Sequence, residues 1–493
     1  MLPRSVSYRK MLGYVLVILI GCTLWCGAPG SLWAGGMLQS APQNPEYVKY
    51  VKDKAAGRLQ TVTEEGYPLG YIPPPLLLPS VKELKEKGVM LAPIVRALPA
   101  TFNLRTAGGV TGVRDQGQCG SCWAFASFAS LESYLKYKVA QTWNFSEQDL
   151  NQYHGFTYGE CQGGNYVMST AYLARWSGPV NEEDMPYPYA TAAPGVPIQK
   201  HVQNVRFLPA RADYTDNDLI KNAVQTKGAV YMSFQWNAAD YNASTYSYYT
   251  TSTGGNHAVA IVGWDDDFSK TNFNTEPTGN GAFICKNSWG KSWGENGYFY
   301  ISYYDHSLLA SAQFCNAASV TKYSQGYEYD PLGWTESLGW YGESVDSTKS
   351  FFANIFKVRK NAKVLKAVSF YTPVPSATYT IWVRDKVTAG NPKSGTLKKK
   401  FTGTLANAGY NTVDFSVPVT LTTNARFSVI VKLTTPGHNW PVPIEQREPG
   451  YSDAASAYTG QSFISYDNID WLDLATSWDI NTNVCLKAFG SAE

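Results

Sequence analysis

The sequence has little charge and little that suits a metal. Only 16% of its 493 residues are Asp, Glu, Lys or Arg, and the net charge is +2, which gives no electrostatic case for a nucleic-acid partner. Cys119 and Cys122 form a Cys-x-x-Cys pair, but the chain has no second such pair to complete a zinc site. Three adjacent aspartates at 265–267 lack EF-hand spacing, so we expect a solvated turn there. We predict no metal and no organic cofactor.

Long apolar runs are also scarce, and the clearest one is N-terminal. Residues 11–25 form an apolar run that follows Arg9 and Lys10 and is short for a membrane span. Ala34 offers a small residue for cleavage, so residues 1–34 are predicted to be a signal peptide. Cys22 follows Leu-Ile-Gly, as in a bacterial lipobox, and a lipoprotein anchored at Cys22 is the alternative. Export makes disulfides permissible.

Three separate segments carry the residue types of thiol chemistry. The segment QGQCGSCWAF at 116–125 contains Cys122, and later segments supply His257 and Asn287. A free cysteine has a pKa near ~8.5, which an imidazolium and a helix N-terminus both lower. Residues 123–132 are alanine-rich and contain neither glycine nor proline, so a helix is predicted to begin at Cys122. His257 would then act on the thiol as a base.

These segments resemble the papain-like cysteine peptidases. The resemblance rests on Cys-Gly-Ser-Cys-Trp at 119–123 and on the spacing of 135 residues from Cys122 to His257. It implies that Cys122 is the nucleophile, that His257 moves the proton and that Asn287 orients the imidazole. It also implies that the Gln116 side chain and the Cys122 backbone N–H hold the oxyanion.

The same resemblance gives expectations for five further positions. It implies that Gly163 and Gly164 line the substrate cleft with backbone, although a simple turn is the alternative. It implies that Trp289 shields the contact between histidine and asparagine. It further implies a disulfide between Cys119 and Cys161, which would brace one side of the cleft.

Other cysteines remain outside that pair. Cys285 and Cys315 lie in or beside predicted strands of one domain and are a candidate second pair, since sequence does not fix connectivity. Cys485 lies near the end of the chain and would remain as one unpaired thiol.

The fold class is predicted to be α+β with two domains. Residues 35–97 read as a pro-segment, with a plain surface linker as the alternative, and residues 98–322 as a papain-like two-lobe peptidase domain. From residue 335 to 493 the pattern changes to alternating or β-branched stretches separated by Gly, Pro, Asn and Ser, which predicts an all-β sandwich. This part resembles the lectin-like domain of some bacterial surface cysteine proteases.

Together these features predict an exported cysteine endopeptidase, made as a zymogen and either secreted or held at the cell envelope. Its expected partners are protein or peptide substrates, with a cell-envelope glycan as a further partner of the C-terminal domain. An endopeptidase is expected because the chain has no His-His insertion of the kind found in exopeptidase relatives. The alternative is a glycan- or envelope-binding adhesin with a dormant peptidase fold.

Overall fold

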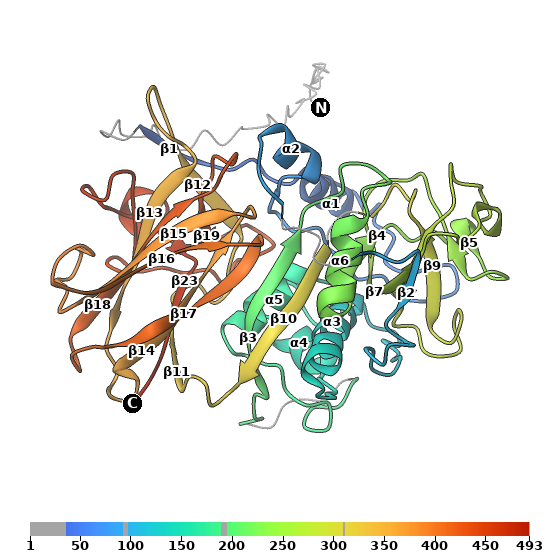
Figure 1. Cartoon of the computed structure of the whole chain (residues 1–493), viewed down its shortest axis with the longest axis horizontal. Coiled ribbons are helices and arrows are strands. Elements are labelled where there is room, and N and C mark those ends of the chain that lie inside the picture. Colours follow the sequence, from blue (N-terminus) through green and yellow to red (C-terminus); the bar gives the residue numbers. More distant parts are fainter. Residues whose placement is uncertain (1–35, 92–96, 189–194, 309–310, 493) are drawn as a thin grey trace, which may run out of the picture.

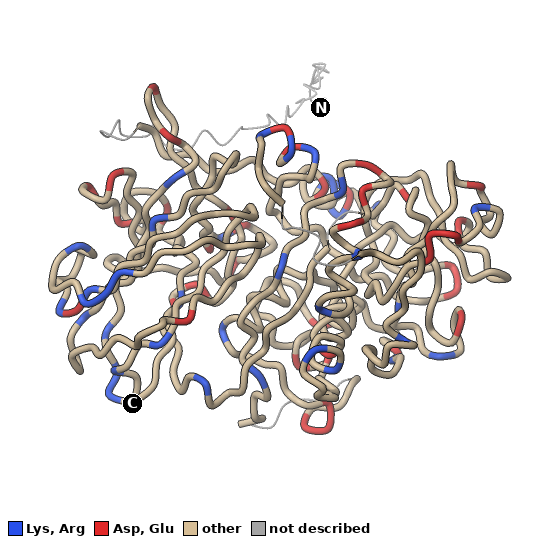
Figure 2. The backbone as a smooth tube through the Cα atoms, viewed as in Figure 1, with Lys and Arg blue, Asp and Glu red and all other residues tan. Residues whose placement is uncertain are grey.

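The computed structural model describes residues 36–91, 97–188, 195–308 and 311–492. The predicted signal peptide and Cys22 lie outside the described residues. Figure 1 shows a helix-containing first domain (residues 97–320) beside a β-rich second domain (residues 325–492), with an N-terminal segment (residues 36–91) running along both. No helix in the described part of the chain is long and apolar enough to cross a bilayer. Residues of both charge signs are spread along both domains (Figure 2).

The N-terminal segment contacts both domains. It comprises β1 (Met37–Ser40), α1 (Pro45–Ala55) and α2 (Val81–Glu86), and the last of these begins with a capping box between Ser80 and Glu83. β1 pairs with β12 of the second domain, whereas the Val81 N–H donates to Ala210 O of the first domain at 2.8 Å. Since Leu84 is 1% exposed and belongs to the core of the second domain, α2 bridges the two.

The first domain starts with helices. After β2 (Thr101–Asn103) come α3 (Cys122–Val139), α4 (Glu147–Tyr153) and α5 (Tyr166–Ala174). α3 is buried on almost all sides, which explains its alanine and serine content. Ser146 caps α4 by accepting from the Asp149 N–H at 3.0 Å. Asn165 caps α5 through the N–H groups of Val167 and Met168.

The strands of the first domain follow, with one longer helix among them. The helix is α6 (Asp218–Lys227), and the strands are β3 (Lys200–Leu208), β4 (Val230–Phe234), β5 (Tyr241–Asn242), β6 (Ser247–Tyr248), β7 (His257–Asp265), β8 (Ala282–Lys286), β9 (Tyr298–Ser302) and β10 (Ser311–Ser319). Short 3₁₀ turns lie at η1 (Ala238–Asp240) and η2 (Lys270–Asn272). The aspartates after β7 form the predicted turn, in which Asp266 pairs with Lys221 at 2.5 Å.

The second domain is built from antiparallel strands. They are β11 (Gln325–Tyr327), β12 (Glu336–Tyr341), β13 (Lys349–Lys357), β14 (Val364–Thr372), β15 (Ala377–Asp385), β16 (Thr396–Leu405), β17 (Gly409–Thr420), β18 (Arg426–Thr434), β19 (Val442–Glu445), β20 (Ser462–Ser465), β21 (Leu472–Asp473), β22 (Asn483–Val484) and β23 (Leu486–Ser491). The short helices are η3 (Lys360–Ala362) and α7 (Leu474–Ser477). Phe352, Val429 and Ile381 share one apolar core with residues of β14 and β23, so sheets pack face to face.

One sheet crosses from the first domain into the second. Within the described residues it has 13 strands: twelve follow the path β11-β23-β14-β17-β3-β10-β4-β7-β8-β9-β6-β5, and β2 pairs with β7 beside this path. The crossing is the antiparallel pairing of β17 with β3, in which Gly409 faces Arg206 and Asn411 faces Asn204. Gly409 has φ 105°, and a Cβ there would lie 2.2 Å from Val205 O, so only glycine fits this approach. The two domains therefore share backbone hydrogen bonds.

The candidate pairing of Cys285 with Cys315 is wrong. Both thiols are free and buried. Cys285 lies on β8 and Cys315 on β10, and β7 and β4 run between these strands in the sheet. Three strand spacings amount to roughly 14 Å, far beyond the Cα separation of about 7 Å that a disulfide tolerates.

Candidate active site

Cys122 is the first residue of α3 and is fully buried. Ser121 occupies the N-cap position without a side-chain cap, and the first turn carries no acidic residue. The positive end of the helix dipole therefore remains available to a thiolate at Cys122. The Ser121 hydroxyl instead lies 2.8 Å from the Tyr187 hydroxyl.

His257 and Asn287 meet because their strands are neighbours. His257 is the first residue of β7 and Asn287 follows β8, and the two strands pair antiparallel. Nε2 of His257 lies 2.8 Å from Oδ1 of Asn287. Since a carbonyl oxygen only accepts, Nε2 carries the proton and Nδ1 keeps its lone pair. Nδ1 has no hydrogen-bond partner in the described part of the chain, so it is available to take a proton.

Trp289 lies over this pair. Its ring stacks on His257 with centroids 4.6 Å apart and an interplanar angle of 25°. Trp289 is 1% exposed, so it separates the hydrogen bond between His257 and Asn287 from water. A hydrogen bond shielded in this way is electrostatically stronger than an exposed one.

The thiol and the imidazole are both neutral in this form of the chain. Burial raises the pKa of Cys122 to about 12, although nearby backbone N–H groups, including those of Ala258 and Gly70, lower it. Burial lowers the pKa of His257 to about 4, against the hydrogen bond to Asn287. Cys122 is therefore a neutral thiol and not the thiolate that catalysis requires. The N-terminal segment, whose Gly70 lies against Cys122, covers the site and excludes water.

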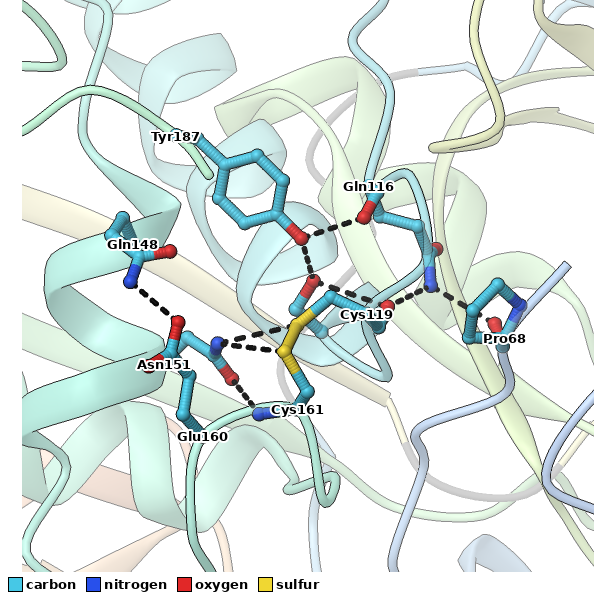
Figure 3. The surroundings of a disulfide bond; sticks show 9 residues. Pro68, Gln116, Cys119, Gln148, Asn151, Glu160, Cys161 and Tyr187 are labelled. Carbon is cyan, nitrogen blue, oxygen red and sulfur yellow. Dashed lines mark hydrogen bonds between the residues drawn. A yellow bond between two sulfur atoms is a disulfide. The ribbon is translucent and has the colours of Figure 1, made fainter. Parts of the chain in front are cut away.

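Gln116 is turned toward the N-terminal segment. Its Nε2 donates to Pro68 O at 2.9 Å and to Cys119 O at 2.8 Å (Figure 3). Its Oε1 accepts from the Ser288 hydroxyl at 2.7 Å. The Tyr187 hydroxyl donates to the Gln116 backbone O at 2.7 Å. Ser288 thus holds Oε1 of the side chain that is expected to bind the oxyanion. The Nε2 donor of the same side chain is occupied by the carbonyl of Pro68.

Residues 70–72 of the N-terminal segment lie between the two walls of the site. The Gly164 N–H donates to Gly70 O at 2.9 Å, and the Ile72 N–H donates to Gly164 O at 3.0 Å. On the opposite wall, the Tyr71 N–H donates to Asn256 O at 3.0 Å. We call the strip between Gly164 and Asn256 the cleft. The segment fills it with an extended chain whose backbone is bonded on both sides.

Glycine is required on both sides of this contact. A Cβ on Gly164 would lie 2.5 Å from the ring of Trp123, and Gly163 has φ 101°. A Cβ on Gly70 would lie 2.0 Å from Gly120 O. A Cβ on Gly163 would lie 2.8 Å from Gly70 O, so the absence of a side chain at Gly163 leaves room for the backbone of the N-terminal segment.

A disulfide joins Cys119 to Cys161, the pair that the resemblance implied. It ties the loop before Cys122 to the segment that carries Gly163 and Gly164 (Figure 3). The Asn151 amide lies 3.4 Å from the Cys119 sulfur, so α4 supports the same bridge.

Several contacts of the site could not be predicted from any one segment of the sequence. Ser288 and Tyr187 bind Gln116, Pro68 O accepts from the Gln116 amide, and Gly70 lies against Cys122. Only the glycine and proline content of the N-terminal segment hinted at an extended chain there.

Comparisons with known proteins agree with this geometry. Residues 98–323 match the papain family of cysteine proteases, and residues 327–490 match the lectin-like domain. The chain carries a papain-family cysteine peptidase domain followed by a lectin-like domain. Cysteine endopeptidase Rep1 of Oryza sativa subsp. japonica is 32% identical to the chain over 256 residues, which cover 47% of this chain and 63% of that protein. The chain spans about three fifths of the length of the curated relatives that it matches.

Solved structures match both the peptidase domain and the lectin-like domain. The crystal structure of the cysteine protease and lectin-like domains of Cwp84, a surface layer associated protein of Clostridium difficile, has a TM-score of 0.77 at 25% identity and covers 92% of this chain and 98% of that one. The structure of clostridial Cwp84 after propeptide cleavage has a TM-score of 0.69 at 27% identity and covers 80% and 99%. The α+β fold, a papain-like domain followed by a β-rich lectin-like domain, is as predicted.

Proposed function

We propose that this chain is an exported cysteine endopeptidase that hydrolyses peptide bonds through a thioester. The observation that carries the proposal is the grouping of Cys122, at a helix N-terminus, with the hydrogen-bonded pair of His257 and Asn287: the backbone of Ala258, the residue after His257, hydrogen-bonds to Cys122. The pair leaves one imidazole nitrogen free to act as a base. The relatives named cysteine endopeptidase support the reaction type.

In the proposed mechanism, Nδ1 of His257 takes the thiol proton and Cys122 attacks the scissile carbonyl carbon. The oxyanion that forms is bound by the Gln116 amide and the Cys122 backbone N–H. The resulting imidazolium protonates the leaving amine, and the thioester remains on Cys122. His257 then activates a water molecule that releases the acid, while Asn287 keeps the ring in its tautomer.

We further propose that residues 35–97 are an inhibitory pro-segment. Its backbone is bonded to Gly164 and Asn256, and its Pro68 carbonyl takes the Gln116 donor. Tyr67 also stacks on Trp289 with ring centroids 4.7 Å apart. An extended segment that occupies the cleft in this way excludes substrate until it is cut or displaced. The structure of Cwp84 after propeptide cleavage is a precedent in a similar protein.

The proposed location is outside the cytoplasm, either secreted or at the cell envelope, with lipid attachment at Cys22 as the alternative. The apolar N-terminal run supports export, and the similarity to a surface layer associated protein supports the envelope. We propose a cell-envelope glycan as the ligand of the lectin-like domain. An adhesin with a dormant peptidase fold is the second candidate, because the lectin-like domain is shared by both functions.

A thiol-specific epoxide inhibitor tests the proposed peptidase. The purified chain is treated before and after limited proteolysis near residue 98, and mass spectrometry locates the adduct. We expect Cys122 to be labelled much faster after cleavage than before it, and we expect Cys122→Ala to fold but to lack both label and hydrolysis. Equal labelling rates before and after cleavage would show that residues 35–97 do not inhibit. No label in either state, together with glycan binding, would favour the adhesin.

A further inference from the structure

A loop of the lectin-like domain reaches the peptidase domain beside the cleft. The loop spans residues 446–457, between β19 and β20, and it docks on residues 156–158. The Thr157 N–H donates to Tyr451 O at 2.9 Å, and the Asp453 N–H donates to the Thr157 hydroxyl at 3.0 Å. That hydroxyl in turn donates to the Asp453 carboxylate at 3.0 Å. Three hydrogen bonds therefore fix the loop to the peptidase domain.

Tyr451 is the residue that this loop inserts. It is 0% exposed, and its ring packs edge-on against Phe156 and Tyr158 of the peptidase domain, with centroids 5.1 and 6.1 Å apart. It also packs edge-on against Tyr47 of the N-terminal segment at 5.6 Å. The ring thus has the peptidase domain on one side and the removable segment on another.

The hydroxyl of Tyr451 ends next to the chain that fills the cleft. The Asn165 amide donates to the Tyr451 hydroxyl at 3.1 Å and to Ile72 O at 3.0 Å. Asn165 follows Gly164 directly, so the same turn of backbone contacts the cleft chain and the lectin-like domain. The Ile72 side chain lies over Gly163, where a Cβ would approach it to 3.1 Å.

This arrangement does not depend on the N-terminal segment. The loop is held by Thr157 and Asn165 of the peptidase domain, and the two domains share the pairing of β17 with β3. When the segment leaves, Tyr47 and Ile72 go with it. Tyr451 then keeps its place and exposes an aromatic edge to the emptied end of the cleft.

We propose that Tyr451 forms a wall of the substrate cleft and selects the third residue before the scissile bond. The proposal rests on the proposed function. Gly70 lies beside Cys122, Tyr71 lies level with Gly164, and Ile72 is the next residue away from the thiol. A substrate whose scissile carbonyl lies at Cys122 has its second residue level with Gly164 and its third at the place of Ile72. The aromatic wall there favours an aromatic or bulky apolar side chain.

The test compares two internally quenched peptides that differ only in the third residue before the cleaved bond, Phe in one and Gly in the other. The full chain is activated by cleavage near residue 98, and kcat/KM is measured for both. We expect the wild type to prefer Phe by at least about tenfold, and Tyr451→Ala to lose most of that preference because kcat/KM for the Phe peptide falls more than kcat/KM for the Gly peptide. Tyr458→Ala is the matched control, since Tyr458 is a nearby tyrosine that is 72% exposed.

A second variant covers the case in which Tyr451→Ala disturbs the docking of the domains. Tyr451→Leu keeps an apolar side chain of similar size, and we expect it to favour Leu over Phe at the third residue, unlike the wild type. An unchanged ratio in Tyr451→Leu, or a wild type that does not distinguish Phe from Gly, overturns the assignment of Tyr451. If the activated wild type cleaves neither peptide and Cys122 is not labelled by the epoxide, the proposed function itself fails.

Discussion

Replacing Gly70 with alanine is expected to loosen the N-terminal segment from the nucleophile. The added Cβ would lie 2.0 Å from Gly120 O and 2.3 Å from Gly120 C, which are backbone atoms of the loop before Cys122. Backbone cannot rotate away as a long side chain can, so the segment itself must move. Overpacking of this kind costs about 1–3 kcal/mol.

The shift also endangers two hydrogen bonds, from the Gly164 N–H to Gly70 O and from the Tyr71 N–H to Asn256 O. Each is worth about 1 kcal/mol. We therefore expect Gly70→Ala to make opening of the segment about 3 kcal/mol easier in total, which corresponds to a population of open chains about a hundredfold larger.

The assay is the rate at which a small epoxide labels Cys122 in the intact, uncleaved chain. If labelling requires opening, the rate for Gly70→Ala should exceed that of the wild type by about a hundredfold. Gly112→Ala is the control, because a Cβ on Gly112 meets nothing within 4 Å. Equal labelling rates for Gly70→Ala and the wild type would refute the claim that close backbone packing at Gly70 keeps the chain latent.

Three further outcomes are expected. Replacing Cys119 and Cys161 by serine opens a loop of 42 residues and should lower the free energy of unfolding by about 4 kcal/mol, measured by guanidinium denaturation without reductant; an unchanged midpoint would contradict this. Gln116→Ala should lower kcat of the activated enzyme by 10²- to 10³-fold with the Cys122 label retained, and an unaltered kcat would remove Gln116 from the oxyanion site. Burial raises the pKa of Cys122 to about 12, so the rate of Cys122 alkylation in the intact chain should keep rising up to that pH, and the free energy of unfolding should fall between pH 9 and 12. After cleavage the pH profile of the alkylation rate should move to lower pH. Coincident profiles before and after cleavage would show that the segment does not bury the thiol.

The local parts of the site could be predicted from the sequence. A run without glycine or proline places the helix start at Cys122, and the observed helix begins there. The Gly-Gly pair has the backbone role that its lack of side chains allows. These features depend on a few consecutive residues, whereas the pairing of β7 with β8, which brings His257 to Asn287, is a contact between separate segments.

Long-range backbone contacts could not be predicted in the same way. The pairing of β17 with β3 uses main-chain groups that every residue has, and only Gly409 marks it. The insertion of Tyr451 beside Asn165 joins residues 286 positions apart, and neither segment has a sequence pattern that would predict contact with the other.

The shared sheet makes the lectin-like domain unsuitable as an exchangeable module. Cutting the chain between the domains would leave β3 with an open edge, so that its N–H and C=O groups become available to other molecules. A peptidase truncated near residue 323 is therefore a candidate for aggregation rather than a smaller working enzyme. Exchange of the lectin-like domain for another module would require a strand that matches β3 as well as a matching surface.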